Sequence, residues 1–136
     1  MFPVLRKLAL PVSIGLTLFL SSCGDQDTHG KIMADALNLL EELATTLEKT
    51  KDQESARSAA GQILHLTESF RKIAERSNAV GKPTPEVRAA LTENYGDLRT
   101  TILARIRSAS ARAKNLNNEE LTSSLGKLGA AWSSLP

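Results

Sequence analysis

The 136-residue sequence has a single cysteine and few aromatic residues, and both shortages restrict the fold. Because Cys23 has no second cysteine to pair with, no internal disulfide can form. The aromatic residues are three phenylalanines, one tyrosine and one tryptophan. A hydrophobic core must therefore be built mainly from leucine, isoleucine and alanine, which favours closely packed helices over a β-sheet.

Motifs for covalent or phosphate chemistry are also missing. The sequence contains no Gly-x-Ser-x-Gly turn to expose a nucleophilic serine, and neither of the glycine-rich motifs that hold phosphates. Two pairs of carboxylates, Glu41-Glu42 and Glu119-Glu120, are adjacent in sequence. On a helix the members of such a pair point in different directions, so they cannot act as a facing acid and base. We predict that the protein is not an enzyme.

Metal ligands are scarce, since the only histidines are His29 and His65. His65 and Glu68 are three residues apart, a spacing that can place two ligands on one helix face. Metal sites in helical bundles, however, need matched ligands from several helices. The chain also lacks the Cys-x-x-Cys-His motif of covalent haem attachment. We predict no metal and no dissociable cofactor.

The excess of positive charge is small and lies in the N-terminal segment. The chain has 17 basic and 15 acidic residues, but Arg6 and Lys7 precede any acid, and the remainder is balanced. The alkaline pI is therefore no argument for nucleic-acid binding. Residues 23–56 carry eight acids and three bases, whereas residues 57–114 carry eleven bases and five acids. This asymmetry predicts helices of complementary charge.

Residues 1–22 have the pattern of a secretory signal. Arg6 and Lys7 are followed by an apolar run from Leu8 to Leu20. As a helix this run spans only about 20 Å, which is short of the roughly 30 Å hydrocarbon core of a bilayer. The sequence therefore favours a cleaved signal over a permanent transmembrane helix.

The run ends in Leu20-Ser21-Ser22-Cys23, which resembles the lipobox of bacterial lipoproteins. The resemblance implies cleavage between Ser22 and Cys23, with a diacylglyceryl group on the Cys23 sulfur and usually an acyl chain on its new amine. Two or three acyl chains anchor a protein durably in a membrane. In enteric bacteria, lipoproteins that have Asp directly after the cysteine resemble those retained in the inner membrane. Because Gly24 stands there, we expect the outer membrane, facing the periplasm.

Apolar residues recur every three or four positions from Lys31 to Lys51, which predicts an amphipathic helix. Its stripe comprises Met33, Ala36, Leu37, Leu40, Leu43, Ala44 and Leu47. Asp52 can cap a second helix, which the short connection would fold back as an antiparallel hairpin. The second stripe comprises Ala56, Ala59, Ile63, Leu66, Phe70 and Ile73. Gly61 interrupts this helix at a cost of about 1 kcal/mol relative to alanine, and we attribute its presence to close packing.

Two further helices follow the segment 81–85. Gly81 suits a left-handed helix end, Thr84 an N-cap and Pro85 a first helical turn. The third stripe comprises Val87, Leu91, Tyr95, Leu98, Ile102, Ile106, Ala109, Ala113 and Leu116, with Gly96 as a possible kink. Asn117 resembles an N-cap for a short fourth helix, whose stripe comprises Leu121, Leu125, Leu128, Trp132 and Leu135. The sequence leaves open whether the third and fourth helices form one bent rod.

We therefore predict an all-α fold: a small antiparallel bundle of three long helices and a short C-terminal helix, preceded by a signal peptide. Residues 1–22 would form the signal, 23–30 a lipidated tether and 31–136 the bundle. A run without acids between Leu98 and Leu116 comprises Arg99, Arg105, Arg107, Arg112 and Lys114. Such a patch can bind an anionic partner, but we favour the simpler interpretation that it offsets the acidic first helix.

Residues 31–130 also resemble, more loosely, uncharacterised small helical lipoproteins of environmental bacteria. The similarity consists of Lys51-Asp52 with Ser55-Ala56 at the second helix, and Pro83 with Pro85-Glu86 at the third. It implies no activity. The helical lipoprotein that is linked to peptidoglycan through a C-terminal lysine is similar too, but this chain ends Ser134-Leu135-Pro136, so we do not expect that linkage.

Taken with the absence of catalytic motifs, these patterns predict a lipid-anchored, non-enzymatic envelope protein that presents a bundle surface for protein interaction or self-association. The expected partners are the membrane, through the lipid on Cys23, and either another envelope protein or a second copy of the chain. The alternative is a carrier that holds a small ligand or metal in the bundle interior near His65.

Overall fold

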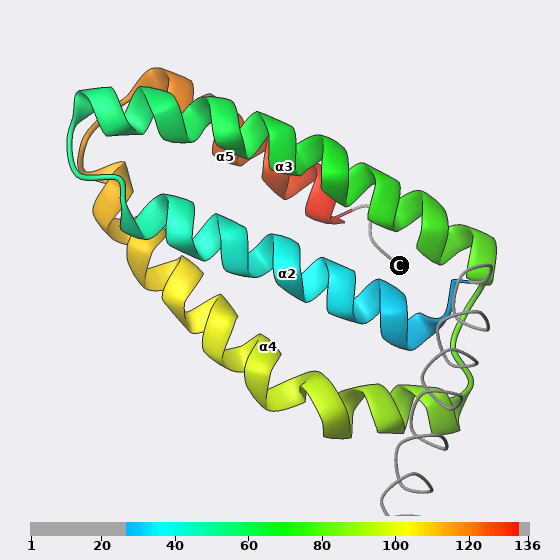
Figure 1. Cartoon of the computed structure of the whole chain (residues 1–136). Coiled ribbons are helices and arrows are strands. Elements are labelled where there is room, and N and C mark those ends of the chain that lie inside the picture. The colour runs from blue at the N-terminus through cyan, green and yellow to red at the C-terminus, as the bar shows by residue number, and fades with distance from the viewer. Residues whose placement is uncertain (1–26, 134–136) are drawn as a thin grey trace, which may run out of the picture.

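The computed structural model describes residues 27–133, which form four helices and, within that range, no strand (Figure 1). They are α2 (His29–Glu48), α3 (Gln53–Val80), α4 (Pro85–Lys114) and α5 (Glu119–Ser133). The predicted all-α bundle of three long helices and a short one is confirmed. The signal peptide, Cys23 and Leu135 lie outside the described residues.

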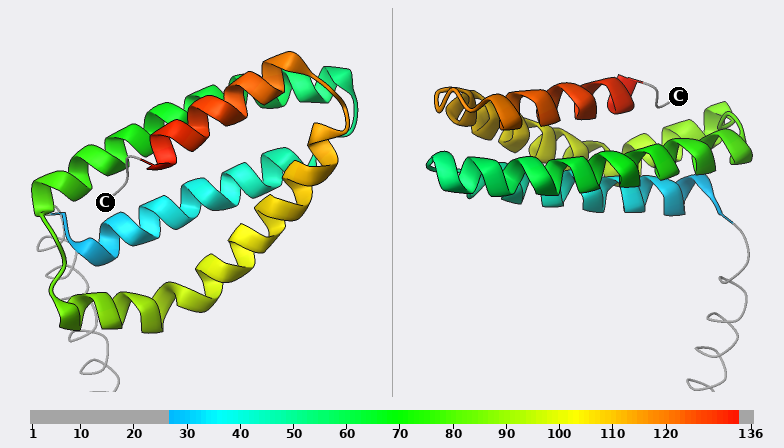
Figure 2. Two further views of the ribbon diagram at one scale, coloured as in Figure 1. Left: turned by 180° about the vertical axis from the view of Figure 1, so that it is seen from behind. Right: turned by 90° about the horizontal axis from the view of Figure 1, so that it is seen from above.

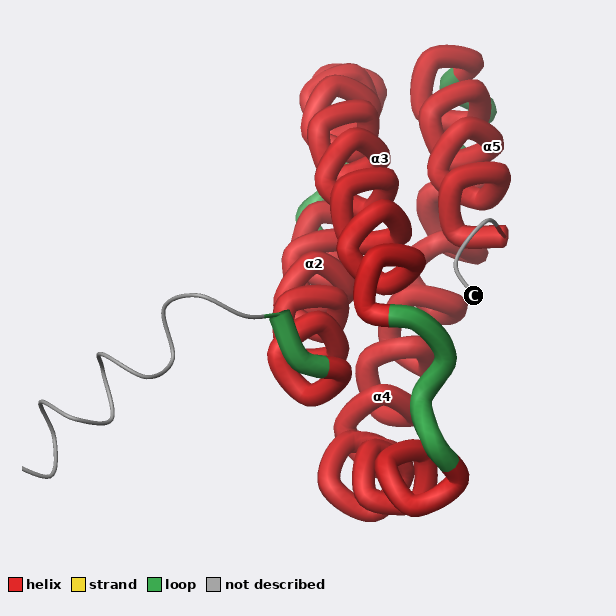
Figure 3. The backbone as a smooth tube through the Cα atoms, turned by 90° about the vertical axis from the view of Figure 1, so that its right-hand side faces the viewer, coloured by secondary structure: helices red, strands yellow, loops and turns green. Residues whose placement is uncertain are grey.

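Consecutive helices run in opposite directions, but they are not all neighbours in space. The extensive contacts join α2 to α3, α2 to α4, and α3 to α5. The views from behind and from above show α4 beside α2 on one side of the bundle and α5 beside α3 on the other (Figure 2). Two of the three main contacts are therefore between parallel helices, and α2 and α3 are the helices that each contact two others. The end-on view shows α3 with α2 on one side and α5 on the other (Figure 3).

The residues that begin α3, end α3 and begin α4 have the predicted capping roles. The Asp52 carboxylate accepts a hydrogen bond from the backbone N–H of Ser55, and the Ser55 hydroxyl accepts one from the N–H of Asp52, which together form a capping box. Gly81 ends α3 with a φ of 88°. The Thr84 hydroxyl accepts from the N–H of Val87, and Pro85 begins α4. The interpretation of segment 81–85 is confirmed.

The connection between α4 and α5 corrects the predicted N-cap. Asn117 does not cap α5; it adopts a φ of 52°, a left-handed turn conformation that asparagine tolerates better than most residues. The cap is Asn118, whose side-chain oxygen accepts from the N–H of Leu121 at 2.9 Å. The side chain of Gln53 donates to the carbonyl of Leu116 and accepts from Asn118, so it ties this turn to the start of α3. Helices α4 and α5 are therefore separate.

The core is built from aliphatic residues and alanine, with one aromatic pair. The largest fully buried side chains are Phe70, Leu47, Ile63, Ile102 and Leu121. Phe70 from α3 meets Trp132 from α5 edge to face, with ring centroids 5.5 Å apart and an interplanar angle of 83°. Buried alanines on three helices allow close approach: Ala44, Ala56, Ala59, Ala60, Ala109 and Ala113.

Gly61 does not have the role that its position suggested. It is exposed, and a Cβ atom built on it would have no heavy atom within 4 Å. The prediction of close packing at this glycine is wrong, because its side of α3 faces solvent.

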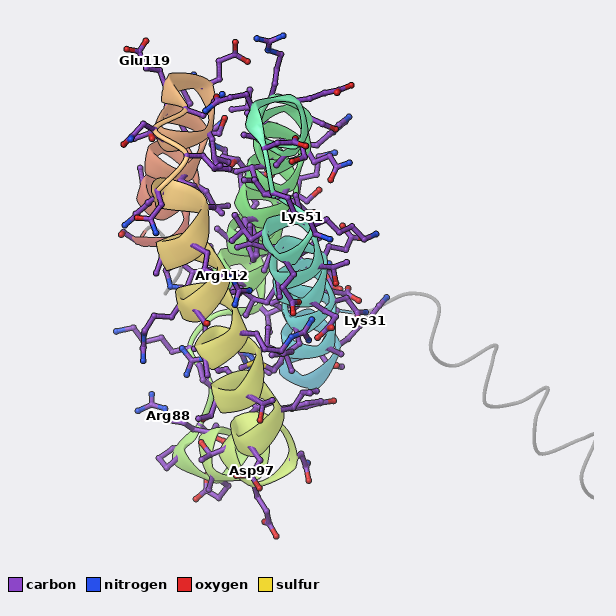
Figure 4. The ribbon with its side chains drawn as sticks, turned by 90° about the vertical axis from the view of Figure 1, so that its left-hand side faces the viewer. Lys31, Lys51, Arg88, Asp97, Arg112 and Glu119 are labelled. Atoms are coloured by element: carbon purple, nitrogen blue, oxygen red, sulfur yellow. The ribbon has the colours of Figure 1, made fainter. Side chains whose placement is uncertain are left out.

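The first half of α4 packs more loosely than its apolar stripe predicts. No residue from Glu75 to Thr101 is buried, and Leu98, an expected core residue, is 51% exposed. The helix bends between its lime-green and yellow parts in Figure 1, close to Asp97 as labelled in Figure 4. Hydroxyls of Thr100 and Thr101 donate to carbonyls four residues earlier, an arrangement that bends helices. The bend turns the stripe away from the core at Leu98.

None of the helices between residues 27 and 133 is long and apolar enough to cross a membrane.

Candidate interaction surface

All five residues of the predicted basic patch lie on α4, but one of them, Arg105, forms ion pairs within the bundle. The Arg105 guanidinium spans to α2, where it contacts the carboxylates of Glu41 and Glu48, each at 2.5 Å. These two acids are seven residues apart and so lie on one face of α2. The hydrogen bonds that Arg105 donates to Glu48 and to Glu41, in that order of effect, raise the pKa of Arg105 above its ordinary value, so it is charged at any physiological pH. The expected pairing of the acidic first helix with the basic third helix is present here.

The other four cations are exposed, and none has an ion pair within residues 27–133: Arg99, Arg107, Arg112 and Lys114. They do not form one patch. Arg112 follows Arg105 by two turns, on the edge of α4 that faces α2, and Figure 4 labels it on the surface. Arg107 and Lys114 are also two turns apart but lie on a different side, because residues two positions apart on a helix do not share a face. The structure therefore separates Arg105 and Arg112 from Arg107 and Lys114, and Arg99, which is not at a seven-residue spacing from either pair, lies apart from both.

A second arginine clamp fixes the point where the N-terminal segment enters the bundle. Arg76, near the end of α3, contacts Asp27 at 2.7 Å and Asp35 at 2.8 Å. The hydrogen bonds that Arg76 donates to Asp27 lower the pKa of Asp27, and the bonds that it donates to Asp27 and Asp35 raise the pKa of Arg76. With Thr28 as N-cap, α2 begins at His29, inside the predicted tether 23–30. No local pattern predicts this clamp, because Arg76 is 49 residues from Asp27 in the chain.

His65 lies on an open groove between α2 and α3 and is exposed to solvent. The groove has a volume of about 540 Å³ and is lined by Glu41, Glu42, Thr45, Thr46, Gln62, His65, Leu66 and Ser69. Glu68, the other candidate ligand, is paired with Arg71. Among the described residues no cluster of three or more His, Cys, Asp or Glu side chains could hold a metal ion. The carrier alternative stays a prediction that native mass spectrometry of the purified protein can test.

The predicted lipidation and cleavage residues, Cys23 and Ser22, lie outside the part of the chain that the structure describes. The first residue that the structure describes after them is Asp27, four positions beyond Cys23. Four residues span at most about 14 Å. A lipid on Cys23 would therefore hold the Asp27–Arg76 clamp close to the membrane surface.

Comparison of the chain with protein-family models, with curated proteins and with solved structures found no match.

Proposed function

We propose that the chain is a lipid-anchored, non-enzymatic protein of the bacterial envelope, and that it presents a bundle surface to another envelope protein or to a second copy of itself. The observation that carries the proposal is the complete lipobox Leu20-Ser21-Ser22-Cys23 after a short signal-like run. The structure supports it in one respect: an ordered bundle begins within four residues of Cys23. With a lipid on Cys23, this spacing would place the helical bundle directly after a short anchor.

The clamp at Arg76 supports a defined orientation of that domain. Asp27 is joined to the end of α3, and the α3–α4 connection lies at the same end of the bundle (Figures 1 and 3). A tether that leaves at Asp27 therefore places this end nearest the bilayer. The α4–α5 connection, at the other end, would face away from the membrane, together with Arg112 and Lys114 at the end of α4.

Replacement of Cys23 tests the anchor. We expect the Cys23→Ala protein to appear in the soluble fraction instead of the membrane fraction. It should also not incorporate labelled palmitate, because the acceptor sulfur is absent. Ser22→Ala is the matched control, since alanine is also accepted before the lipobox cysteine, and it should remain bound. A Cys23→Ala chain that stays in the membrane would refute lipid anchoring.

The choice of membrane has its own test in an enteric host. We expect the parent chain to separate with outer-membrane vesicles on a density gradient and Gly24→Asp to shift to the inner membrane. Recovery of the parent chain with the inner membrane would contradict the outer-membrane proposal. Crosslinking in intact cells, followed by mass spectrometry, then identifies the partner.

A further inference from the structure

The outward face of α4 carries opposite charges in its two halves. Glu86 and Glu93 lie in the first half, Arg107 and Lys114 in the second, and Thr100 stands midway. Successive members of this set are seven positions apart, so all five residues return to nearly the same side of the helix. All five are exposed. The buried residues of α4, by contrast, lie on its other side.

These four charges have no ion-pair partner within residues 27–133. Around them the face has small exposed side chains, notably Ala90, Ala104 and Ala111. Alanines leave room for a second helix to approach closely. The face is therefore sterically open, charged at both ends and unused by its own bundle.

We infer that this face binds the same face of a second copy, with the two α4 helices antiparallel and a two-fold axis beside Thr100. Glu93 and Arg107 are equally far in sequence from Thr100, so Glu93 would lie opposite the partner's Arg107 and, by symmetry, the reverse. Glu86 and Lys114 are related in the same way. The interface thus makes two pairs of each kind and closes at a dimer.

The order of the charges along this face of α4 determines whether the two helices run parallel or antiparallel, and which kind of partner can bind. In a parallel arrangement Glu93 would meet the partner's Glu93, and like charges in contact repel. An anionic lipid surface would attract Arg107 and Lys114 but repel the acidic half of the same face. Only a surface with the reverse charge order fits the whole length, and the chain itself supplies one. This inference rests on the proposed function, because it names the partner of that bundle surface.

The curvature of α4 determines which of the two kinds of ion pair contributes more to the dimer. The helix curves around α2, with its convex side outward (Figures 1 and 2). Two convex helices touch near their middle and diverge towards their ends. Glu93 and Arg107, which are closer to Thr100, therefore contribute more to the dimer than Glu86 and Lys114.

The test is sedimentation equilibrium of the purified full chain in a mild non-ionic detergent. We expect a dimer whose dissociation constant rises about tenfold with Glu93→Arg or Arg107→Glu, because each change replaces two attractions by two repulsions. The double variant Glu93→Arg/Arg107→Glu should return to within about threefold of the parent. Glu42→Arg is the matched control and should change nothing, because Glu42 is an exposed acid on α2 that has no ion pair among residues 27–133. Far-UV circular dichroism confirms that each variant is folded.

A disulfide test gives an independent result. With Cys23→Ala as background, Thr100→Cys should form a covalent dimer under mild oxidation, because two copies of this residue meet at the axis. Gln62→Cys, exposed on α3, should not. A monomeric parent chain, or a dimer equally sensitive to the Glu93 and Glu42 reversals, would overturn this interface. If such a chain still crosslinked to another protein in cells, the proposed function would stand, since only the identity of the partner would have failed.

Discussion

Truncation of Phe70 should remove a large part of the stability of the bundle. Its ring is fully buried and meets Trp132 at the junction of α3 and α5. Replacement of a buried phenylalanine by alanine costs about 3–5 kcal/mol through lost burial and the cavity left behind. Edge-to-face pairing accounts for about 0.5–1.5 kcal/mol beyond burial. Because domains of this size have a free energy of unfolding of about 5–15 kcal/mol, Phe70→Ala should lose about a fifth of it or more.

Denaturant unfolding followed by far-UV circular dichroism measures this loss. Trp132 is the only tryptophan, so its fluorescence reports the same contact locally. Leu64→Ala is the matched control on α3, since Leu64 is 42% exposed, and it should lose less than about 1 kcal/mol. If Phe70→Ala lost no more than Leu64→Ala, with an unchanged denaturant slope, the assignment of Phe70 to the centre of the core would be refuted.

Three further predictions concern capping, glycines and local order. The N–H of Ser55 holds the pKa of Asp52 below its ordinary value, so its stabilising effect is complete at neutral pH and is lost as the pH falls through the lowered pKa. The thermal midpoint should therefore fall in acid, and less so in Asp52→Asn; equal falls would contradict this. Gly61→Ala should raise the free energy of unfolding by about 0.5–1 kcal/mol, whereas Gly81→Ala, at positive φ, should lower it by about 1 kcal/mol. Opposite signs in denaturant unfolding are the check. Amides of residues 85–101 should exchange hydrogen faster than those of residues 102–114, because only the latter include buried side chains; uniform protection along α4 would argue against a loosely packed first half.

Local chemistry made much of the fold predictable. Asp52, Thr84 and Pro85 act within one turn of their own positions, so their capping roles follow from the neighbouring sequence alone. The choice between Asn117 and Asn118 as a cap was not predictable in this way. Both residues suit an N-cap, and the bonds of Gln53 to the turn, which come from the start of α3, contribute to the observed geometry.

The structure differs from the sequence-based predictions mainly in details that depend on how distant segments meet. The stripe of α4 continues through Leu98 in sequence, yet the bend leaves that residue exposed. The net charges of the two segments predicted that acidic and basic helices would pair. They could not identify Arg105 as the one cation of the patch that does so, because its distance from Glu41 and Glu48 depends on how the helices cross.

The pairing of α2 with α4, and of α3 with α5, also determines how the chain can fold. Each of these contacts joins segments separated by a whole intervening helix; Arg105 and Glu41, for example, are 64 residues apart. The α4–α5 hairpin makes no extensive contact of its own within residues 27–133. The chain must therefore lose the entropy of closing these long loops before most of the core contacts form. This loss slows folding relative to a bundle of nested hairpins. A nascent chain ending before Glu119 lacks the helix that covers one side of α3, so the complete core has to wait until α5 has been synthesised.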